Sequence, residues 1–231
     1  MDAHRESKQS PPGCRLRNLS TSAIVGTRPA AWLRRGCKRA LKWCRSILAA
    51  ARALMVRTDT GRWESVARED PPWDERNRII AGFIPAHSAV LDLGSGAQTL
   101  RKHLAPDCQY QPCDIIRSSP DVIYCDFNAG IYPALPRKYD YVICSGVFEY
   151  IRDPAHFISQ VRNYGRKALF SFNPYDPAQS VVDRLACGWL NHLSESQLER
   201  LFSSHGLTWR ILHRKDLTPV VQEIVYELTP G

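Results

Sequence analysis

Short apolar runs alternate with longer amphipathic stretches over the C-terminal two thirds of the chain. Runs at Ala89–Leu93, Tyr139–Ser145 and Lys167–Phe172 are mostly apolar, and two weaker runs end at Asp114 and Asn128. Runs of this kind are typical of buried parallel strands, which are covered on both faces. Two further runs, at 207–213 and 220–228, are expected to pair as antiparallel strands.

The stretches between these runs predict helices over 73–83, 97–105 and 154–164, the last beginning with Pro154 and closed by Gly165. Ser194-Glu195-Ser196-Gln197 has the pattern of a capping box, and it opens a helix expected to end at His205-Gly206. Strands that alternate with helices indicate an α/β domain with a mainly parallel sheet.

The first run ends in Val-Leu-Asp-Leu-Gly-Ser-Gly, a strand followed by a turn with two glycines. Glycine lets the backbone bend sharply and lets a ligand approach where a side chain would collide. Asp92 precedes the turn and is expected to reach the same crevice. The arrangement suits a nucleotide-like ligand at the carboxyl end of a first parallel strand, although a plain strand-to-helix turn also fits the glycine pair taken alone.

Polar residues close the next three strands as well. Asp114 ends the second strand, where a carboxylate can accept hydrogen bonds from both ribose hydroxyls. The third strand ends in Asp126-Phe127-Asn128, and the fourth runs through Ser145 into Phe148-Glu149-Tyr150. Over about Trp73 to Leu228, this series resembles the class I S-adenosylmethionine-dependent methyltransferases, in particular their small-molecule branch (type 11/12-like).

The resemblance implies a Rossmann-like, doubly wound, seven-stranded sheet with an antiparallel terminal strand, and S-adenosyl-L-methionine as the cofactor. In that family the glycine loop backs the methionine part, the acid after strand two binds the ribose, and the acid after strand three meets the adenine. Carried onto this chain, the cofactor-binding residues are Asp92, Gly94, Ser95, Gly96, Asp114, Ile115, Asp126, Phe127, Asn128 and Ser145. The chain departs from the family pattern at Gln98, which replaces a third loop glycine, and at Tyr150, where a histidine is common.

Methyl transfer requires alignment of two reactants, and an oxygen or nitrogen acceptor also needs a base. Glu149 and Tyr150 follow the fourth strand, and His192 lies before the capping box, so these three are the candidate catalytic residues. Glu149 and His192 equally suit structural positions at helix starts, and no general base is identified. Asn173-Pro174-Tyr175 differs in sequence and in place from the Asn-Pro-Pro-Tyr motif of amino-methylating enzymes.

The cysteines and the hydropathy exclude other classes of protein. None of the eight cysteines forms a Cys-x-x-Cys pair, so no metal site is expected. Several lie in expected strands, where cysteine is a small apolar filler, and free thiols favour a cytoplasmic location. The chain has no stretch of about 18 apolar residues, so a membrane span is not expected.

Charge is distributed unevenly along the chain. Residues 1–68 carry 15 Lys and Arg against 4 Asp and Glu, whereas residues 69–231 carry 16 against 19. Residues 30–55 place apolar side chains, among them Leu33, Leu41 and Leu48, at helical spacings of three and four. This basic amphipathic helix suits an anionic membrane surface, nucleic acid, or a cover for the core domain. An organelle transit peptide has a similar composition.

These observations predict three segments: a disordered one (1–29), a basic amphipathic helical extension (30–68) and a methyltransferase domain (69–231). The expected acceptor is a small molecule, or a lipid- or glycan-linked group reached by peripheral membrane contact through residues 30–55. The sequence contains no recognisable nucleic-acid module, which disfavours a nucleic-acid partner. RNA or protein methylation with the basic arm for docking, and a non-catalytic cofactor-binding scaffold, are the alternatives.

Overall fold

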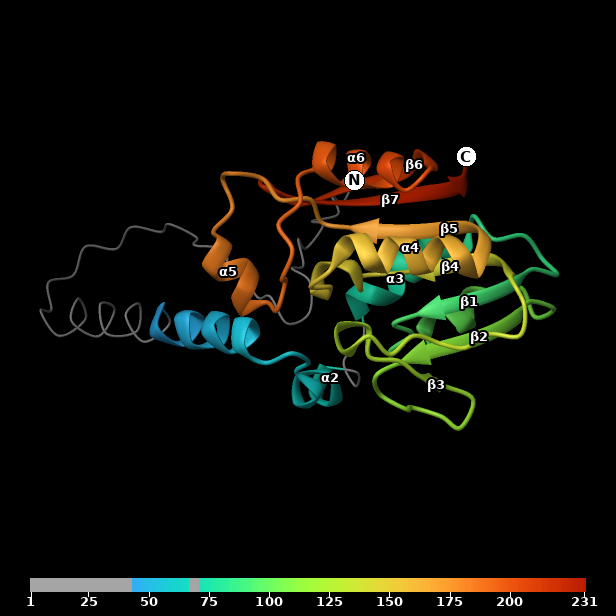
Figure 1. Cartoon of the computed structure of the whole chain (residues 1–231), viewed down its shortest axis with the longest axis horizontal. Helices are drawn as coiled ribbons and strands as arrows, with labels where there is room; N and C mark the ends of the chain where they lie inside the picture. Colours follow the sequence, from blue (N-terminus) through green and yellow to red (C-terminus); the bar gives the residue numbers. More distant parts are fainter. Residues whose placement is uncertain (1–42, 67–70) are drawn as a thin grey trace, which may run out of the picture.

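A seven-stranded sheet forms the centre of the molecule (Figure 1). The computed structural model describes residues 43–66 and 71–231. The strand order is β3-β2-β1-β4-β5-β7-β6, and β7 is antiparallel to both of its neighbours while the first five strands are parallel. The strands are β1 (Ala89–Leu93), β2 (Gln109–Asp114), β3 (Ile123–Tyr124), β4 (Tyr139–Cys144), β5 (Gly165–Phe172), β6 (Leu207–Thr218) and β7 (Val221–Pro230). The predicted fold class is confirmed.

Helices cover both faces of this sheet. The helices on these faces are α3 (Pro71–Ala81), α4 (Pro154–Tyr164) and α6 (Glu195–Ser204). A helix over residues 43–55, α2 (Thr60–Val66) and α5 (Val181–Ala186) lie beyond the carboxyl ends of the strands (Figure 1). The 3-10 turns are η1 (Thr99–His103), η2 (Phe127–Ala129) and η3 (Phe148–Tyr150). One apolar core lies under α4 and α6, where Phe157 and Phe202 are fully buried. A smaller core lies under α3 and η1, around Ile80 and Leu100. The sheet is therefore doubly wound.

Two predicted elements are shorter than expected. The helix predicted over 97–105 is the five-residue turn η1, because Gln98 adopts the left-handed conformation (φ 57°) and cannot belong to an α-helix. The strand predicted over 121–128 is reduced to β3, because Asp126 turns to cap η2 and accepts a hydrogen bond from Ala129 N. This early turn directs Asp126 and Phe127 towards the carboxyl edge of the sheet.

The predicted ends of the later helices have mixed outcomes. The capping box of Ser194 and Gln197 is present, and Gly206 follows the helix with positive φ, as predicted. Gly165 is the C-cap of α4, as predicted, but its backbone is extended rather than left-handed, and it begins β5, where a Cβ atom would lie 2.5 Å from Val142 Cγ2. The short helix α5, capped by Ser180, was not predicted.

The described residues also bear on the expectations about metal, thiols and the membrane. No three His, Cys, Asp or Glu side chains in this part of the chain are grouped to hold a metal ion. Cys108, Cys113, Cys125 and Cys144 are free thiols, whereas Cys187 is disulfide-bonded, so the expectation of free thiols is wrong there. No helix within 43–66 and 71–231 is long and apolar enough to cross a membrane. The predicted disordered segment 1–29 and the first part of the predicted helix lie outside the described residues.

Candidate active site

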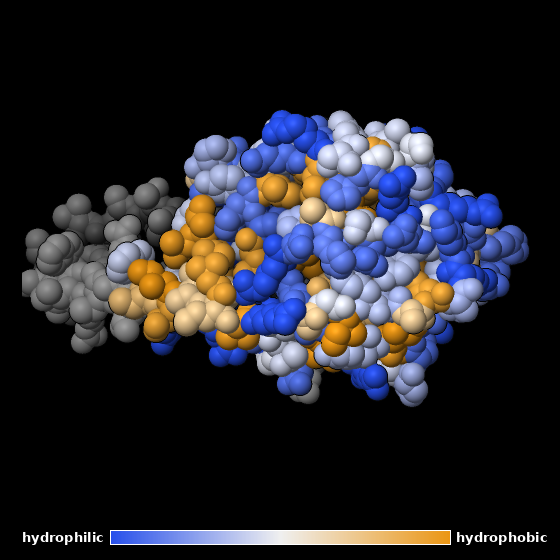
Figure 2. Space-filling model, in the orientation of Figure 1, coloured by the Kyte–Doolittle hydropathy of each residue, from blue (hydrophilic) through white to orange (hydrophobic). Residues whose placement is uncertain are grey.

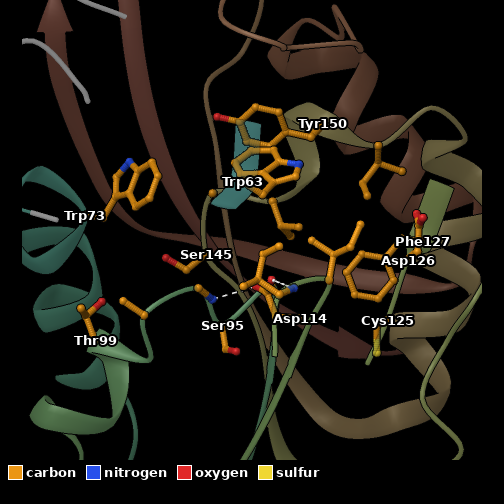
Figure 3. Close-up of a pocket in the computed structure, with 18 of the residues that line it drawn as sticks. Trp63, Trp73, Ser95, Thr99, Asp114, Cys125, Asp126, Phe127, Ser145 and Tyr150 are labelled. Carbon is orange, nitrogen blue, oxygen red and sulfur yellow. Dashed lines mark hydrogen bonds between the residues drawn. The ribbon is translucent and has the colours of Figure 1, made fainter. Parts of the chain in front are cut away.

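A cleft of about 930 Å³, its open mouth included, lies at the carboxyl ends of the parallel strands (Figure 3). Its floor comes from the loop after β1 and from the ends of β2 and β4, and its far wall from Asp126 and Phe127. The near wall and roof come from the N-terminal part of the chain, including Trp63 and Trp73. The cleft therefore lies at the sheet edge to which the sequence assigned the ligand.

The glycine loop forms the part of the floor that follows β1. Gly94 has φ 81°, and a Cβ atom there would lie 2.8 Å from Val147 Cγ2, so a side chain would force the β1 and β4 loops apart. The N–H groups of Gly94 and Ser95 both donate to the carbonyl of Cys113. Ser95 Oγ is buried and has no hydrogen-bond partner among the described residues. Because this oxygen is inaccessible to solvent, it does not face the open space of the cleft, and only the rest of Ser95 belongs to the lining.

Asp114 ties the end of β2 to this loop. Its Oδ2 accepts a hydrogen bond from Gly96 N at 2.7 Å, and its Oδ1 accepts one from Ile116 N at 2.8 Å. Burial raises the pKa of the Asp114 carboxyl, and the two backbone donors oppose the shift. Each carboxylate oxygen has a second lone pair, so Asp114 can still accept hydrogen bonds from a ligand in the cleft.

Asp126 faces the cleft from the other side, and its partner comes from the N-terminal segment. The hydroxyl of Thr58 lies 2.8 and 2.9 Å from the two carboxylate oxygens, across 68 positions of sequence. Arg57 Nε donates to the backbone carbonyl of Asn128 close by. The stretch of residues 52–63, here called the strap, is therefore fixed against the loop that follows β3.

Phe127 and Asn128 lie in the lining with different roles. The Phe127 ring packs edge-on against Phe157 of the main core, with centroids 5.2 Å apart, and lines the cleft. The Asn128 amide donates to the carbonyl of Tyr150, and its oxygen accepts from Arg152 N. Asn128 thus holds the loop after β4 in place, and Ile115 contributes apolar surface beside Asp114.

Ser145, at the end of β4, belongs to a polar chain that crosses the cleft floor. Its hydroxyl donates to Asn77 Oδ1 at 2.6 Å and accepts from Arg76 Nε at 2.9 Å. Arg76 also forms an ion pair with Glu223 at 3.0 Å, and both side chains are about nine-tenths buried. Arg76 lies against Gly146, where a Cβ atom would be 2.3 Å from Arg76 Nη2. This series of polar side chains holds α3 against β4 and β7.

Aromatic side chains form the roof of the cleft. Trp63 and Tyr150 meet edge to face with ring centroids 4.5 Å apart, and Trp189 Nε1 donates to the Tyr150 hydroxyl. Figure 3 shows Trp73 on one side of the space above Ser145 and Trp63 on the other. Thr58, Trp63, Trp73 and Arg76 were not predicted as site residues, because nothing local in the sequence links the N-terminal segment to the strand ends.

Glu149 and His192 do not line the cleft. Glu149 is buried, its Oε1 accepts from Asn173 N at 2.9 Å, and burial raises its pKa. His192 Nδ1 accepts a hydrogen bond from Arg184 Nε, while burial and the Arg184 charge lower the pKa of the imidazole. With Nδ1 occupied and the ring neutral, Nε2 carries the proton and is a donor. Of the three catalytic candidates, only Tyr150 reaches the cleft.

Asp92 is also outside the lining. Its carboxylate is fully buried in β1 and accepts a hydrogen bond from the Tyr110 hydroxyl at 2.6 Å. Burial raises the pKa of Asp92 to about 7. This side chain contacts the neighbouring strand β2 rather than the open space.

The strand order and the placement of the cleft define the Rossmann-like fold of class I S-adenosylmethionine-dependent methyltransferases. A solved structure with this fold is 1,6-didemethyltoxoflavin-N1-methyltransferase of Burkholderia thailandensis, with bound 1,6-didemethyltoxoflavin and S-adenosylhomocysteine. It is 14% identical, with 78% of this chain and 89% of that chain covered and a TM-score of 0.55.

Two further solved structures share the fold. The mitomycin 7-O-methyltransferase MmcR is 14% identical (81% and 68% covered, TM-score 0.53), and CalO1, a methyltransferase in calicheamicin biosynthesis bound to S-adenosylhomocysteine, is 18% identical (68% and 54%, TM-score 0.51). No family model and no curated protein sequence matches the chain. Identities this low establish a common fold only.

Proposed function

We propose that this protein is an enzyme that transfers a methyl group from S-adenosyl-L-methionine to a small-molecule acceptor. The observation that carries the proposal is the cleft, in which the Asp114 carboxylate is hydrogen-bonded to the glycine loop on one side of the space and Asp126 and Phe127 bound the other side. Solved methyltransferases with this fold contain S-adenosylhomocysteine, one of them together with 1,6-didemethyltoxoflavin, which supports the same function.

The residues present suit the proposed cofactor. Apart from its two neighbours in the chain, no atom of the described residues lies within 4 Å of the place where a Cβ atom on Gly96 would be, so the glycine loop leaves open space for a ligand close to its backbone. In this proposal Asp114 receives the ribose hydroxyls, and Asp126 and Phe127 border the adenine. Held by these residues, S-adenosyl-L-methionine would supply an electrophilic methyl group on a sulfonium.

The remaining part of the cleft is assigned to the acceptor. It is bordered by Trp63, Trp73 and Tyr150, with Ser145 and Arg76 at its floor. These rings exclude water and orient an acceptor, which is the main contribution a protein makes to this reaction. Fixed aromatic rings on two sides suit an acceptor with a flat apolar portion.

The described lining holds no free general base. Its two carboxylates, Asp114 and Asp126, already accept hydrogen bonds from the backbone and from Thr58. The pKa of a phenol is ordinarily near 10, and the pKa of Tyr150 is raised further, chiefly by burial. In this proposal the acceptor therefore loses its proton to water, or needs to lose none, and the pH dependence of turnover follows the acceptor's own ionisation.

More specifically, we propose that the acceptor is lipid- or glycan-linked and that residues 30–55 make peripheral contact with the membrane. The exposed apolar residues of the N-terminal helix favour this form over nucleic acid, since phosphate contacts call for cations rather than large apolar side chains. Turnover with a labelled methyl group distinguishes this function from RNA or protein methylation and from a non-catalytic scaffold.

Titration calorimetry with S-adenosylhomocysteine tests cofactor binding. We expect binding by the full chain and at least a tenfold weaker affinity for Asp114→Ala, because the side chain would lose both its own contacts and its hold on Gly96 and Ile116. Asp107→Ala, an exposed carboxylate that pairs with His87, is the matched control and should bind normally. Equal affinities for all three proteins would refute the assigned site.

Turnover with S-adenosylmethionine labelled in the methyl group and a cell extract identifies the acceptor class. The label is measured in lipid, glycan, small-molecule, protein and RNA fractions. Label in the first three supports the proposal, and label in protein or RNA supports the alternative enzyme. Binding without any transfer of label would favour the scaffold.

A further inference from the structure

The helix of residues 43–55 presents its large apolar side chains to the outside. Leu48 and Met55 are 70% and 79% exposed, and Trp43, Ile47 and Leu54 are exposed on the same arc of the helix. The opposite arc, which faces the protein, carries only small side chains: Ala50 is buried, and Ser46, Ala49 and Ala53 are partly buried. A helix that covered the core would have the reverse orientation.

The apolar surface continues onto a second element. In α5, Val181 and Val182 are exposed, and Figure 2 shows apolar atoms gathered over the 43–55 helix and over α5 at one end of the molecule. Arg62 of α2 donates to the carbonyls of Ala186 and Cys187, which joins the end of the strap to the end of α5. Extended exposed apolar patches on soluble folds mark interaction sites.

The charge of this region identifies the partner. Six Lys and Arg lie at positions 34, 35, 38, 39, 42 and 45, and no acidic residue lies between Glu6 and Asp59. A basic segment that runs into an exposed apolar helix face is complementary to an anionic lipid bilayer, which offers phosphate groups at its surface and acyl chains beneath. A second copy of the chain would bring two strongly basic segments together, so like charges disfavour self-association at this face.

We propose that the outward face of residues 43–55 and the exposed valines of α5 form one surface that docks on an anionic bilayer. The inference rests on the proposed function for its purpose, because docking brings the cleft to acceptors held in the membrane. From this helix the chain passes directly to Thr58 and Trp63, which line the cleft. Arg152 holds the intervening turn by donating to the carbonyls of Ala53, Val56 and Arg57.

Sedimentation with vesicles of phosphatidylcholine, alone or mixed with phosphatidylglycerol, tests the surface on the full chain. We expect binding to the mixed vesicles that weakens with salt, and at least a tenfold loss in the double variant Leu48→Glu/Met55→Glu. Phe83→Glu/Trp209→Glu is the matched control, because both side chains are exposed apolar residues outside this surface and the charge change is the same. Val181→Glu/Val182→Glu tests the contribution of α5, where we expect a smaller loss.

Each variant is also titrated with S-adenosylhomocysteine, which separates docking from cofactor binding. Unchanged calorimetry with lost sedimentation supports the docking surface, and equal sedimentation of wild type and Leu48→Glu/Met55→Glu overturns it. The docking surface is also overturned if the wild-type chain does not bind the mixed vesicles. The same holds if the wild-type chain forms dimers and Leu48→Glu/Met55→Glu is monomeric. If vesicles bind and S-adenosylhomocysteine does not, the proposed function fails while the docking surface stands.

Discussion

At the scale of single residues, buried carboxyls distinguish structural acids from acids that can meet a ligand. Asp92 lies one residue before the end of β1 and Asp114 ends the neighbouring β2, yet only Asp114 lines the cleft. The difference follows from strand geometry, since successive side chains point to opposite faces and a residue within a strand lies against its neighbours. Asp92 is buried against Tyr110 of β2 and does not line the cleft, so we expect it to affect stability rather than ligand binding.

Asp92→Asn is expected to change how stability depends on pH. The folded-state pKa is about 7, above the ordinary value of 3.8, so between these values the folded protein binds a proton that the unfolded chain lacks. The stabilisation is full below about pH 4 and is lost as the pH rises through about 7. Asparagine stays neutral and still accepts from Tyr110.

Denaturant unfolding of both proteins at several pH values measures this effect. Between about pH 5 and 7, the free energy of unfolding of the variant should rise relative to that of the wild type by roughly 1 kcal/mol per pH unit. Parallel curves for the two proteins would show that Asp92 is ionised in the folded state over this range.

At the scale of elements, the strap depends on polar contacts with distant parts of the chain. Arg152→Ala removes three hydrogen bonds to the carbonyls of residues 53, 56 and 57. We expect faster amide hydrogen exchange in residues 52–63 and a severalfold weaker affinity for S-adenosylhomocysteine, because Thr58 would be held less firmly against Asp126.

Arg166→Ala is the control for this experiment, since that side chain is highly exposed and, within the described part of the chain, pairs only with Asp140, at 3.9 Å. Exchange in the strap should stay at the wild-type rate in this variant. Unchanged exchange in Arg152→Ala as well would mean that the strap is held by Trp63 packing rather than by Arg152.

The elements also show which signals the sequence contains. Strands β1, β4 and β5 are apolar on both faces, and the capping box of α6 is a local motif, so both could be predicted. The left-handed turn at Gln98 and the early end of β3 could not, because each depends on contacts made by the folded chain: Gln98 Nε2 donates to Ser119 Oγ, and Asp126 accepts from Thr58. The same holds for the cleft, where the strand ends were visible in sequence but the aromatic roof was not.

At the scale of the whole molecule, the two cores and the strap make separate contributions. Every buried member of both core clusters lies beyond residue 79, whereas the strap adds hydrogen bonds and the Trp63–Tyr150 ring pair at the surface. We therefore propose that the boundary predicted near residue 69 separates a self-sufficient fold from an extension that completes its cleft and bears the apolar surface.

A chain of residues 69–231 tests this division. We expect cooperative thermal unfolding and a loss of roughly 2–4 kcal/mol of stability, from a few partly exposed hydrogen bonds and one ring pair. Affinity for S-adenosylhomocysteine should fall, because Thr58 and Trp63 are gone, and sedimentation with anionic vesicles should disappear, because α5 alone presents too little apolar surface. A truncated chain that unfolds without cooperativity would show that the extension belongs to the folding unit, and one that binds vesicles as the full chain does would place the lipid contact elsewhere on the domain.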